Sequence, residues 1–149
     1  MDTPLDYNDF KRGLEFTLKW EGGYVNNAND PGGETKWGIS KRSYPTLDIA
    51  NLEPAQAAEI YYRDFWQRSG CSGLVFPFNC VLFDTSVNVG VSRAVSWARD
   101  CKDVQSLLDR RRNYYISLAK QNPKFSVFLK GWLARVSDLQ KFVEVNSVS

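Results

Sequence analysis

Residues 78–89 constrain the fold more than any other part of the chain, because they are apolar almost all round. They read FNCVLFDTSVNV and are followed by Gly90. A segment that is apolar on all sides is typically buried on all sides, as a core helix or a core strand. At twelve residues this segment is long for a strand, which favours a helix. We therefore predict a central core helix that Gly90 ends.

Two polar side chains, Asp84 and Asn88, stand four residues apart on this apolar segment. Buried polar groups must find hydrogen-bonding partners. They either satisfy neighbouring groups in the core or face a cleft and bind a polar ligand. The sequence leaves both alternatives open.

A second helix is predicted from about residue 8 to Trp20, and its apolar stripe ends at Glu21. The stripe has helical spacing and consists of Phe10, Leu14, Thr17, Leu18 and Glu21. Glu21 should therefore point toward a core, where burial raises the pKa of a carboxyl group. A raised pKa is what a general acid requires near neutral pH.

The stretch after Glu21 is a Gly/Asn/Asp loop, which we expect to join two short strands, Tyr24-Val25 and Thr35–Ile39, in a β-ribbon. A cluster of this kind is commonly only a turn. Here, however, Asp30 lies among polar neighbours and should stay ionised. Two carboxyls in contrasting environments are typical of an acid and its partner in glycosidic-bond cleavage. The rings of Tyr24 and Trp37 could offer flat faces to sugars.

The segment EGGYVNNANDPGGETKWGIS closely resembles the signature of glycoside hydrolase family 108. This family comprises phage and bacterial N-acetylmuramidases, which cut the β-1,4 bond between N-acetylmuramic acid and N-acetylglucosamine in peptidoglycan. The resemblance implies that Glu21 is the essential acid. It also implies that Asp30 and Thr35 position the attacking water or stabilise the transition state. Asn29 precedes Asp30 as in the family motif, whereas Ala28 replaces the more usual proline.

Two further segments resemble the family. FDTSVNVG is similar to its FD-x-x-x-N-x-G segment, and NPKFSVFLKGWLARV is similar to its F-x-x-GW-x-x-R block, with Arg135 matching. Under the resemblance, Asp84 and Asn88 either support the core or bind sugar amides and hydroxyls. The candidate substrate contacts are Tyr24, Asn29, Trp37, Asp84 and Asn88.

The fold implied is mainly α (α+β), a lysozyme-like fold with a small β-ribbon beside the catalytic helix. We expect one domain over residues 1–149, because no linker separates a catalytic segment at about 8–70 from a helical segment at about 75–143.

Four more helices are predicted, the shortest of them at residues 91–98. One begins at Pro54 and ends near Ser69-Gly70, with an apolar face of Ala55, Ala58, Tyr62, Phe65 and Trp66 and with Tyr61 off that face. One is capped by Asp103, runs to about Gln121 and turns Arg111 inward, toward a buried acid. Whether Arg111 meets Glu21 stays open. The last helix runs from about Phe128 to Phe142.

Composition excludes several kinds of chemistry. The chain has no histidine, so triads and metal sites that need one are ruled out, and we expect hydrolysis without metal or cofactor. A net charge of +2 gives no support for nucleic-acid binding, and Arg110–Arg112 is too short a run to change that. The three cysteines, Cys71, Cys80 and Cys101, are read as reduced thiols, with a Cys71–Cys80 disulfide as the less favoured alternative.

The N-terminus lacks a basic start and an apolar run, so we expect neither a signal peptide nor a membrane span. The resemblance then implies a monomeric phage endolysin that acts on the glycan strand. It would stay in the host cytoplasm until a holin releases it to the cell wall. Two rivals remain: a lytic transglycosylase, which ends with a 1,6-anhydro sugar, and a wall-binding or regulatory protein that has lost the chemistry.

Overall fold

The computed structural model describes residues 5–26 and 33–147 of the chain, and it is mainly helical with one small sheet. The α-helices are α1 Tyr7–Glu21, α2 Pro54–Tyr61, α3 Phe78–Val89, α4 Val91–Asp100, α5 Val104–Gln121 and α6 Ser126–Ser147. Shorter helical segments are η1 Ile49–Asn51, η2 Tyr62–Gln67, η3 Cys71–Gly73 and η4 Pro123–Phe125. The predicted fold class is confirmed.

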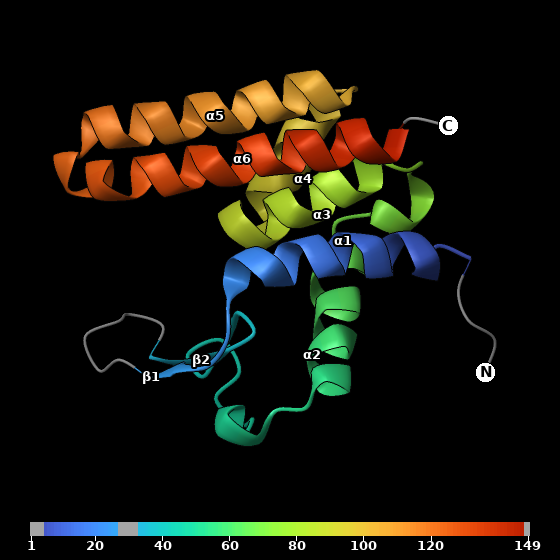
Figure 1. Ribbon diagram of the computed structural model, residues 1–149, viewed down its shortest axis with the longest axis vertical. Helices are drawn as coiled ribbons and strands as arrows, with labels where there is room; N and C mark the ends of the chain where they lie inside the picture. The colour runs from blue at the N-terminus through green and yellow to red at the C-terminus, as the bar shows by residue number, and fades with distance from the viewer. Residues whose placement is uncertain (1–4, 27–32, 148–149) are drawn as a thin grey trace.

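Helix α3 lies at the centre, as its composition predicts. It packs against α1, α4 and α5, and its residues from Asn79 to Ser86 are all buried. Figure 1 shows α5 and α6 side by side along one edge of the molecule, with α3 and α4 in the middle and α1 beyond them. The strands and α2 lie on the far side of α1.

The core contains residues from both halves of the chain. Phe10 of α1 makes edge-to-face ring contacts with Trp66 of η2 and Phe83 of α3. Asp6, just before α1, fixes the position of this aromatic cluster. Its carboxylate accepts hydrogen bonds from Trp66, Ser72 and Tyr62. The helix begins at Tyr7, one residue before its predicted start.

Within the described residues, the β-ribbon has three strands where two were predicted. β1 is Val25–Asn26, β2 is Glu34–Lys36 and β3 is Ile39–Ser40, and they form an antiparallel sheet in the order β1-β2-β3. The predicted strand Thr35–Ile39 was wrong because the chain reverses at Trp37 and Gly38, both of which have positive φ. Thr35 therefore pairs with Val25 on one side and Ser40 on the other.

The helix that starts at Pro54 changes its geometry part-way, so its predicted apolar face is only partly right. Trp66 is buried and Ala58, Tyr62 and Phe65 pack against the core, but Ala55 is exposed. The buried residues are Ala57, Ile60, Tyr61 and Trp66. The step of five residues from Tyr61 to Trp66 matches the wider turn of the π-helical segment η2. Tyr61, expected off the face, is only 1% exposed.

The later helices agree more closely with those predicted from the sequence. Asp103 caps α5, since its carboxylate accepts a hydrogen bond of 2.8 Å from the backbone N–H of Ser106. Helix α6 is longer than predicted at both ends, and Phe128, where it was expected to begin, is 53% exposed. Cys71, Cys80 and Cys101 are free and buried. Across the part of the chain that the structure describes, no helix is long and apolar enough to cross a membrane.

Candidate active site

Glu21 is the last residue of α1, where the chain leaves the helix for the β-ribbon. Gly22 follows with a φ of 78° and donates its N–H to the carbonyl of Leu18, which ends the helix. The Glu21 side chain is 23% exposed, so it is mostly buried but open on one side. A reacting group needs this combination of a fixed position and access to substrate.

Arg135 of α6 forms the ion pair with Glu21, at 3.3 Å between Nη1 and Oε1. Burial raises the pKa of Glu21 above its ordinary value of 4.5, although the charge and hydrogen bond of Arg135 oppose the rise. The net direction is upward. A carboxyl with a raised pKa is a better proton donor near neutral pH than a solvated one.

A second contact between α1 and α6 fixes the end of α1. The indole Nε1 of Trp20 donates a hydrogen bond of 2.8 Å to Asp138, and the Lys19 ammonium lies 2.7 Å from the same carboxylate. Together with the Arg135 ion pair, these contacts hold Glu21 against the last helix of the chain.

Asp84 of α3 lies behind Glu21 and shares Arg135 with it. Arg135 donates to both Asp84 oxygens, at 3.2 and 2.8 Å, and Arg111 of α5 donates at 2.9 Å. Thr17 of α1 adds a bond of 2.8 Å. Burial alone would raise the pKa of Asp84, but Arg111 and Arg135 outweigh burial and lower it to about 2. Asp84 is therefore ionised, and at 1% exposure its placement fits the structural alternative.

Arg111 pairs with Asp84 and not with Glu21. Arg111 is fully buried and makes its ion pair with Asp84, while Arg135 makes the one with Glu21. Arg111 also donates from Nε to the Tyr115 hydroxyl at 2.8 Å, and Tyr115 donates to the side-chain oxygen of Asn88. Asn88 therefore belongs to the outer end of this buried network.

The turn between β2 and β3 packs directly on Glu21. A Cβ atom built on Gly38 would lie 3.0 Å from Cβ of Glu21 and 2.3 Å from the Tyr61 hydroxyl oxygen. The Tyr61 hydroxyl donates a hydrogen bond of 2.6 Å to the carbonyl of Trp37, which fixes the turn. Because Gly38 has no side chain, the turn can approach the carboxyl this closely.

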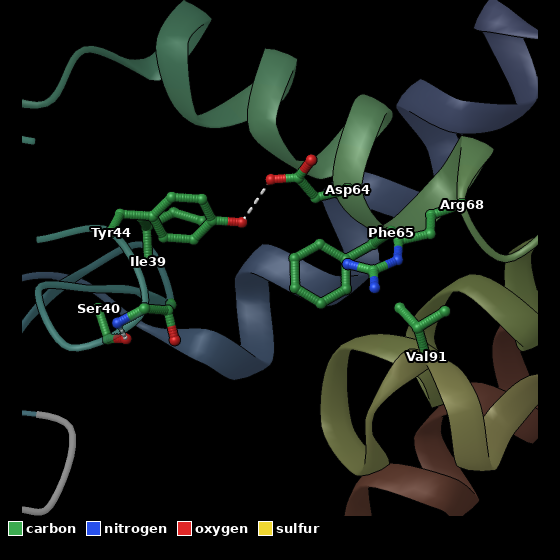
Figure 2. Close-up of a pocket in the computed structure, with 9 residues that line it drawn as sticks. Ile39, Ser40, Tyr44, Asp64, Phe65, Arg68 and Val91 are labelled. Atoms are coloured by element: carbon green, nitrogen blue, oxygen red, sulfur yellow. Dashed lines mark hydrogen bonds between the residues drawn. The ribbon is translucent and has the colours of Figure 1, made fainter. Parts of the chain in front are cut away.

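A cavity of about 410 Å³ opens beside this turn. Gly38, Ser40 and Tyr44 line it from the ribbon side. Asp64, Phe65 and Arg68 line it from η2 and the turn that follows, and Val91 lines it from the start of α4. Figure 2 shows these groups facing one opening, with the hydrogen bond of 2.6 Å from Tyr44 to Asp64 across its upper side.

Three further residues that the sequence predicted for the site, Tyr24, Thr35 and Trp37, lie in or next to the β-ribbon. Thr35 is half-buried in the middle strand. Tyr24 is 47% exposed and donates a hydrogen bond of 2.6 Å to Glu34. Trp37 is half-buried, with the Lys36 ammonium 4.7 Å from its ring centroid. Asn29 and Asp30 lie outside the described residues.

The described residues contain no group of three or more Cys, Asp or Glu side chains that could hold a metal ion. The acidic side chains of the site are instead engaged by arginines, as at Asp84 and Glu21.

Comparison with known families identifies the relationship. The chain matches the model of glycosyl hydrolase 108 over residues 14–90, which is more than half of its length. The chain belongs to the glycosyl hydrolase 108 family. The matched segment contains Glu21, Gly38, Tyr61 and Asp84, whereas Arg111 and Arg135, which pair with the two carboxylates, lie beyond it. The protein is a glycoside hydrolase by family.

A solved structure, that of Brucella abortus SagA, matches this glycosyl hydrolase 108 member with a TM-score of 0.74 and 20% sequence identity. The alignment covers 96% of this chain and 98% of that one. At this identity the match shows a shared fold, over nearly the whole chain. A search of curated proteins finds no significant match.

Sequence reasoning missed three residues of the site: Arg135 as the partner of Glu21, Gly38 and Tyr61. Arg135 did carry a signal, since it lies between Trp132 and Val136 on the apolar face of the last helix. A charged residue in that position calls for a buried partner. The contact of Tyr61 with Gly38 had no local signal, because it depends on how η2 is placed against the ribbon.

Proposed function

We propose that this glycoside hydrolase is an N-acetylmuramidase that cleaves the β-1,4 bond between N-acetylmuramic acid and N-acetylglucosamine in peptidoglycan. The observation that carries the proposal is the Glu21 carboxyl. It ends α1 inside the family domain, is mostly buried, has a raised pKa and stays accessible beside the Gly38 turn. The choice of bond comes from the resemblance of the Glu21–Ser40 segment to the muramidase signature.

In the proposed mechanism, Glu21 protonates the glycosidic oxygen while the sugar develops oxocarbenium character. Asp30, with Thr35, holds the attacking water or supports the cation. The role of Arg135 is to orient the Glu21 carboxyl through the ion pair of 3.3 Å. Arg135 also limits the rise of the Glu21 pKa, so that the group can lose its proton and regain it in each cycle.

The test compares wild type with Glu21→Gln on purified Gram-negative sacculi, measured as loss of turbidity and release of reducing ends. General acid catalysis contributes about 10²–10⁴ in rate, so Glu21→Gln should lose at least about a hundredfold. Glu15→Gln is the matched control, because Glu15 is an exposed residue of the same helix. A wild-type rate in Glu21→Gln, with an unchanged circular dichroism spectrum, would refute the assignment.

Two rivals give different outcomes. A lytic transglycosylase would release muropeptides lighter by one water, which mass spectrometry detects. A wall-binding or regulatory protein would bind sacculi without clearing them. The presence of a partner carboxyl, Asp30, in the signature favours hydrolysis over transglycosylation.

We also propose that the protein acts as a monomeric phage endolysin, released from the host cytoplasm to the wall by a holin. The support is the resemblance to phage enzymes. Expression in Escherichia coli cytoplasm should leave cells intact until the inner membrane is permeabilised. Lysis without permeabilisation would contradict this role.

A further inference from the structure

We propose that the cavity between the β-ribbon and η2 binds a carboxylate of the acidic peptide stem that branches from a peptidoglycan strand, with Arg68 as the anion-binding group. This inference rests on the proposed function, because it assigns the part of the same substrate that extends away from the cleaved bond.

The position of the cavity links it to the reacting group. Gly38 lines the cavity, and the same glycine packs against Glu21 so closely that an added Cβ would lie 3.0 Å from Cβ of Glu21. A glycan strand placed at Glu21 therefore has its substituents within reach of the opening. A cavity of about 410 Å³ is within the size range of small-ligand sites.

The charges in the cavity favour an anion. Arg68 is exposed and, within the described residues, makes no hydrogen bond or ion pair. The one carboxylate in the lining, Asp64, is already engaged. It receives the Tyr44 hydroxyl at 2.6 Å and the guanidinium of Arg63 at 2.8 and 3.2 Å. Arg63 is therefore the ion-pair partner of Asp64. Arg68 acts on that carboxylate without forming an ion pair with it, so the N–H donors of Arg68 stay available to a ligand.

The other lining groups fit a peptide. The hydroxyl oxygen of Ser40 accepts the backbone N–H of Ser43 at 3.1 Å, so its hydrogen remains able to donate to an incoming oxygen. Phe65 and Val91 supply apolar surface opposite the ribbon, as Figure 2 shows. An amide-linked chain with small apolar side chains and free carboxylates offers partners to all of these groups, whereas an uncharged sugar would leave Arg68 unused.

The first experiment measures binding of a synthetic stem tripeptide with free carboxylates, by NMR titration of the full chain. The control ligand is the same tripeptide with its carboxyls amidated. We expect Arg68→Ala to weaken binding of the free-acid tripeptide by at least about tenfold, the loss typical of a hydrogen bond to a charged group. Arg99→Ala, which removes an exposed arginine on α4 away from the cavity, should bind as wild type does. Equal binding of the acid and amidated tripeptides, or no effect of Arg68→Ala, would overturn the proposal.

The second experiment compares rates on peptide-bearing strands and on strands stripped of peptide by an amidase. The ratio of the two rates should fall about tenfold in Arg68→Ala and stay unchanged in Arg99→Ala. If Arg68→Ala leaves this ratio unchanged, the proposed peptide-stem site at Arg68 is refuted. This holds whether both rates fall together or neither falls. If wild type cleaves neither substrate, the muramidase proposal fails, and the tripeptide titration still decides whether the cavity binds the stem.

Discussion

Arg135 Nη1 lies 3.3 Å from Glu21 Oε1, and this ion pair joins two residues that are 114 positions apart in the chain. The same guanidinium also holds Asp84, so Arg135 connects the candidate acid to the centre of the core. The chemistry of Glu21 therefore depends on the last helix of the chain as well as on the segment that contains it.

Replacing Arg135 should change the pH dependence of catalysis. Glu21 must be protonated to act as the acid, so the rate should fall as pH rises through its pKa, which lies above 4.5. Arg135 lowers that pKa, so Arg135→Gln should raise it and move the descending limb of the pH–rate profile to higher pH. Arg110→Gln removes an exposed arginine and is the control. Coincident limbs for wild type and Arg135→Gln would show that Arg135 does not tune Glu21.

Asp84→Asn should strongly destabilise the fold, because it leaves Arg111 and Arg135 buried without their shared counter-ion. Breaking a buried ion pair from one side costs about 3–5 kcal/mol in the free energy of unfolding. Urea denaturation measures the change. Asp109→Asn removes the exposed ion pair with Arg112 but keeps an oxygen for the hydrogen bond from Gln105, so it should cost less than about 1 kcal/mol. Similar losses in both variants would refute the role assigned to Asp84.

The same carboxylate should make stability depend on acid pH. The pKa of Asp84 is lowered from 3.8 in the unfolded reference to about 2 in the fold. The resulting stabilisation is present above pH 3.8 and is lost as pH falls toward 2. Thermal unfolding of wild type should show this loss between those values. Asp84→Asn should lack this component, and an equal dependence in both proteins would contradict the prediction.

Gly38→Ala should impair activity far more than Gly33→Ala. Both glycines have positive φ, 79° and 68°, so both variants carry a similar backbone cost. A Cβ at Gly33 meets nothing within 4 Å, whereas one at Gly38 meets the Tyr61 hydroxyl at 2.3 Å and Glu21 at 3.0 Å. Turbidity assays of the two folded variants measure the difference.

Removing the Tyr61 hydroxyl should relieve part of that clash. The double variant Gly38→Ala/Tyr61→Phe is therefore expected to recover part of the activity lost in Gly38→Ala. Equal activities of the Gly33→Ala and Gly38→Ala variants would show that close packing of the turn is not needed.

Asn88→Ala distinguishes the two alternatives for Asn88. Its side-chain oxygen accepts the Tyr115 hydroxyl, so we expect a loss of about 1–3 kcal/mol in unfolding free energy from the unmatched partner. We also expect a KM close to that of wild type. Tyr115→Phe removes the same bond from the other side, and a double-mutant cycle should reveal their coupling. A raised KM with unchanged stability would instead indicate contact with substrate.

Local patterns in the sequence predicted much of the fold. The apolar character of residues 78–89 correctly predicted the buried helix α3. The apolar stripe that ends at Glu21 predicted the length and end of α1, and the capping residue Asp103 predicted the start of α5. These succeeded because helical periodicity, glycine stops and capping act over a few neighbouring residues. Family membership could be recognised for the same reason, since the Glu21–Ser40 signature is contiguous.

The tertiary structure decided which side chains surround Glu21. The residues around Arg135 in the sequence do not predict its partners, because α6 contacts Glu21 and Asp84 only in the packed fold. The burial of Tyr61 depends on the π-helical turn that follows it, and the third strand depends on the reversal at Gly38. The sequence by itself thus determined the positions of most helices, the family and the candidate acid. Only packing between distant segments decided the acid's electrostatic environment, because charge and burial depend on distances in space rather than positions along the chain.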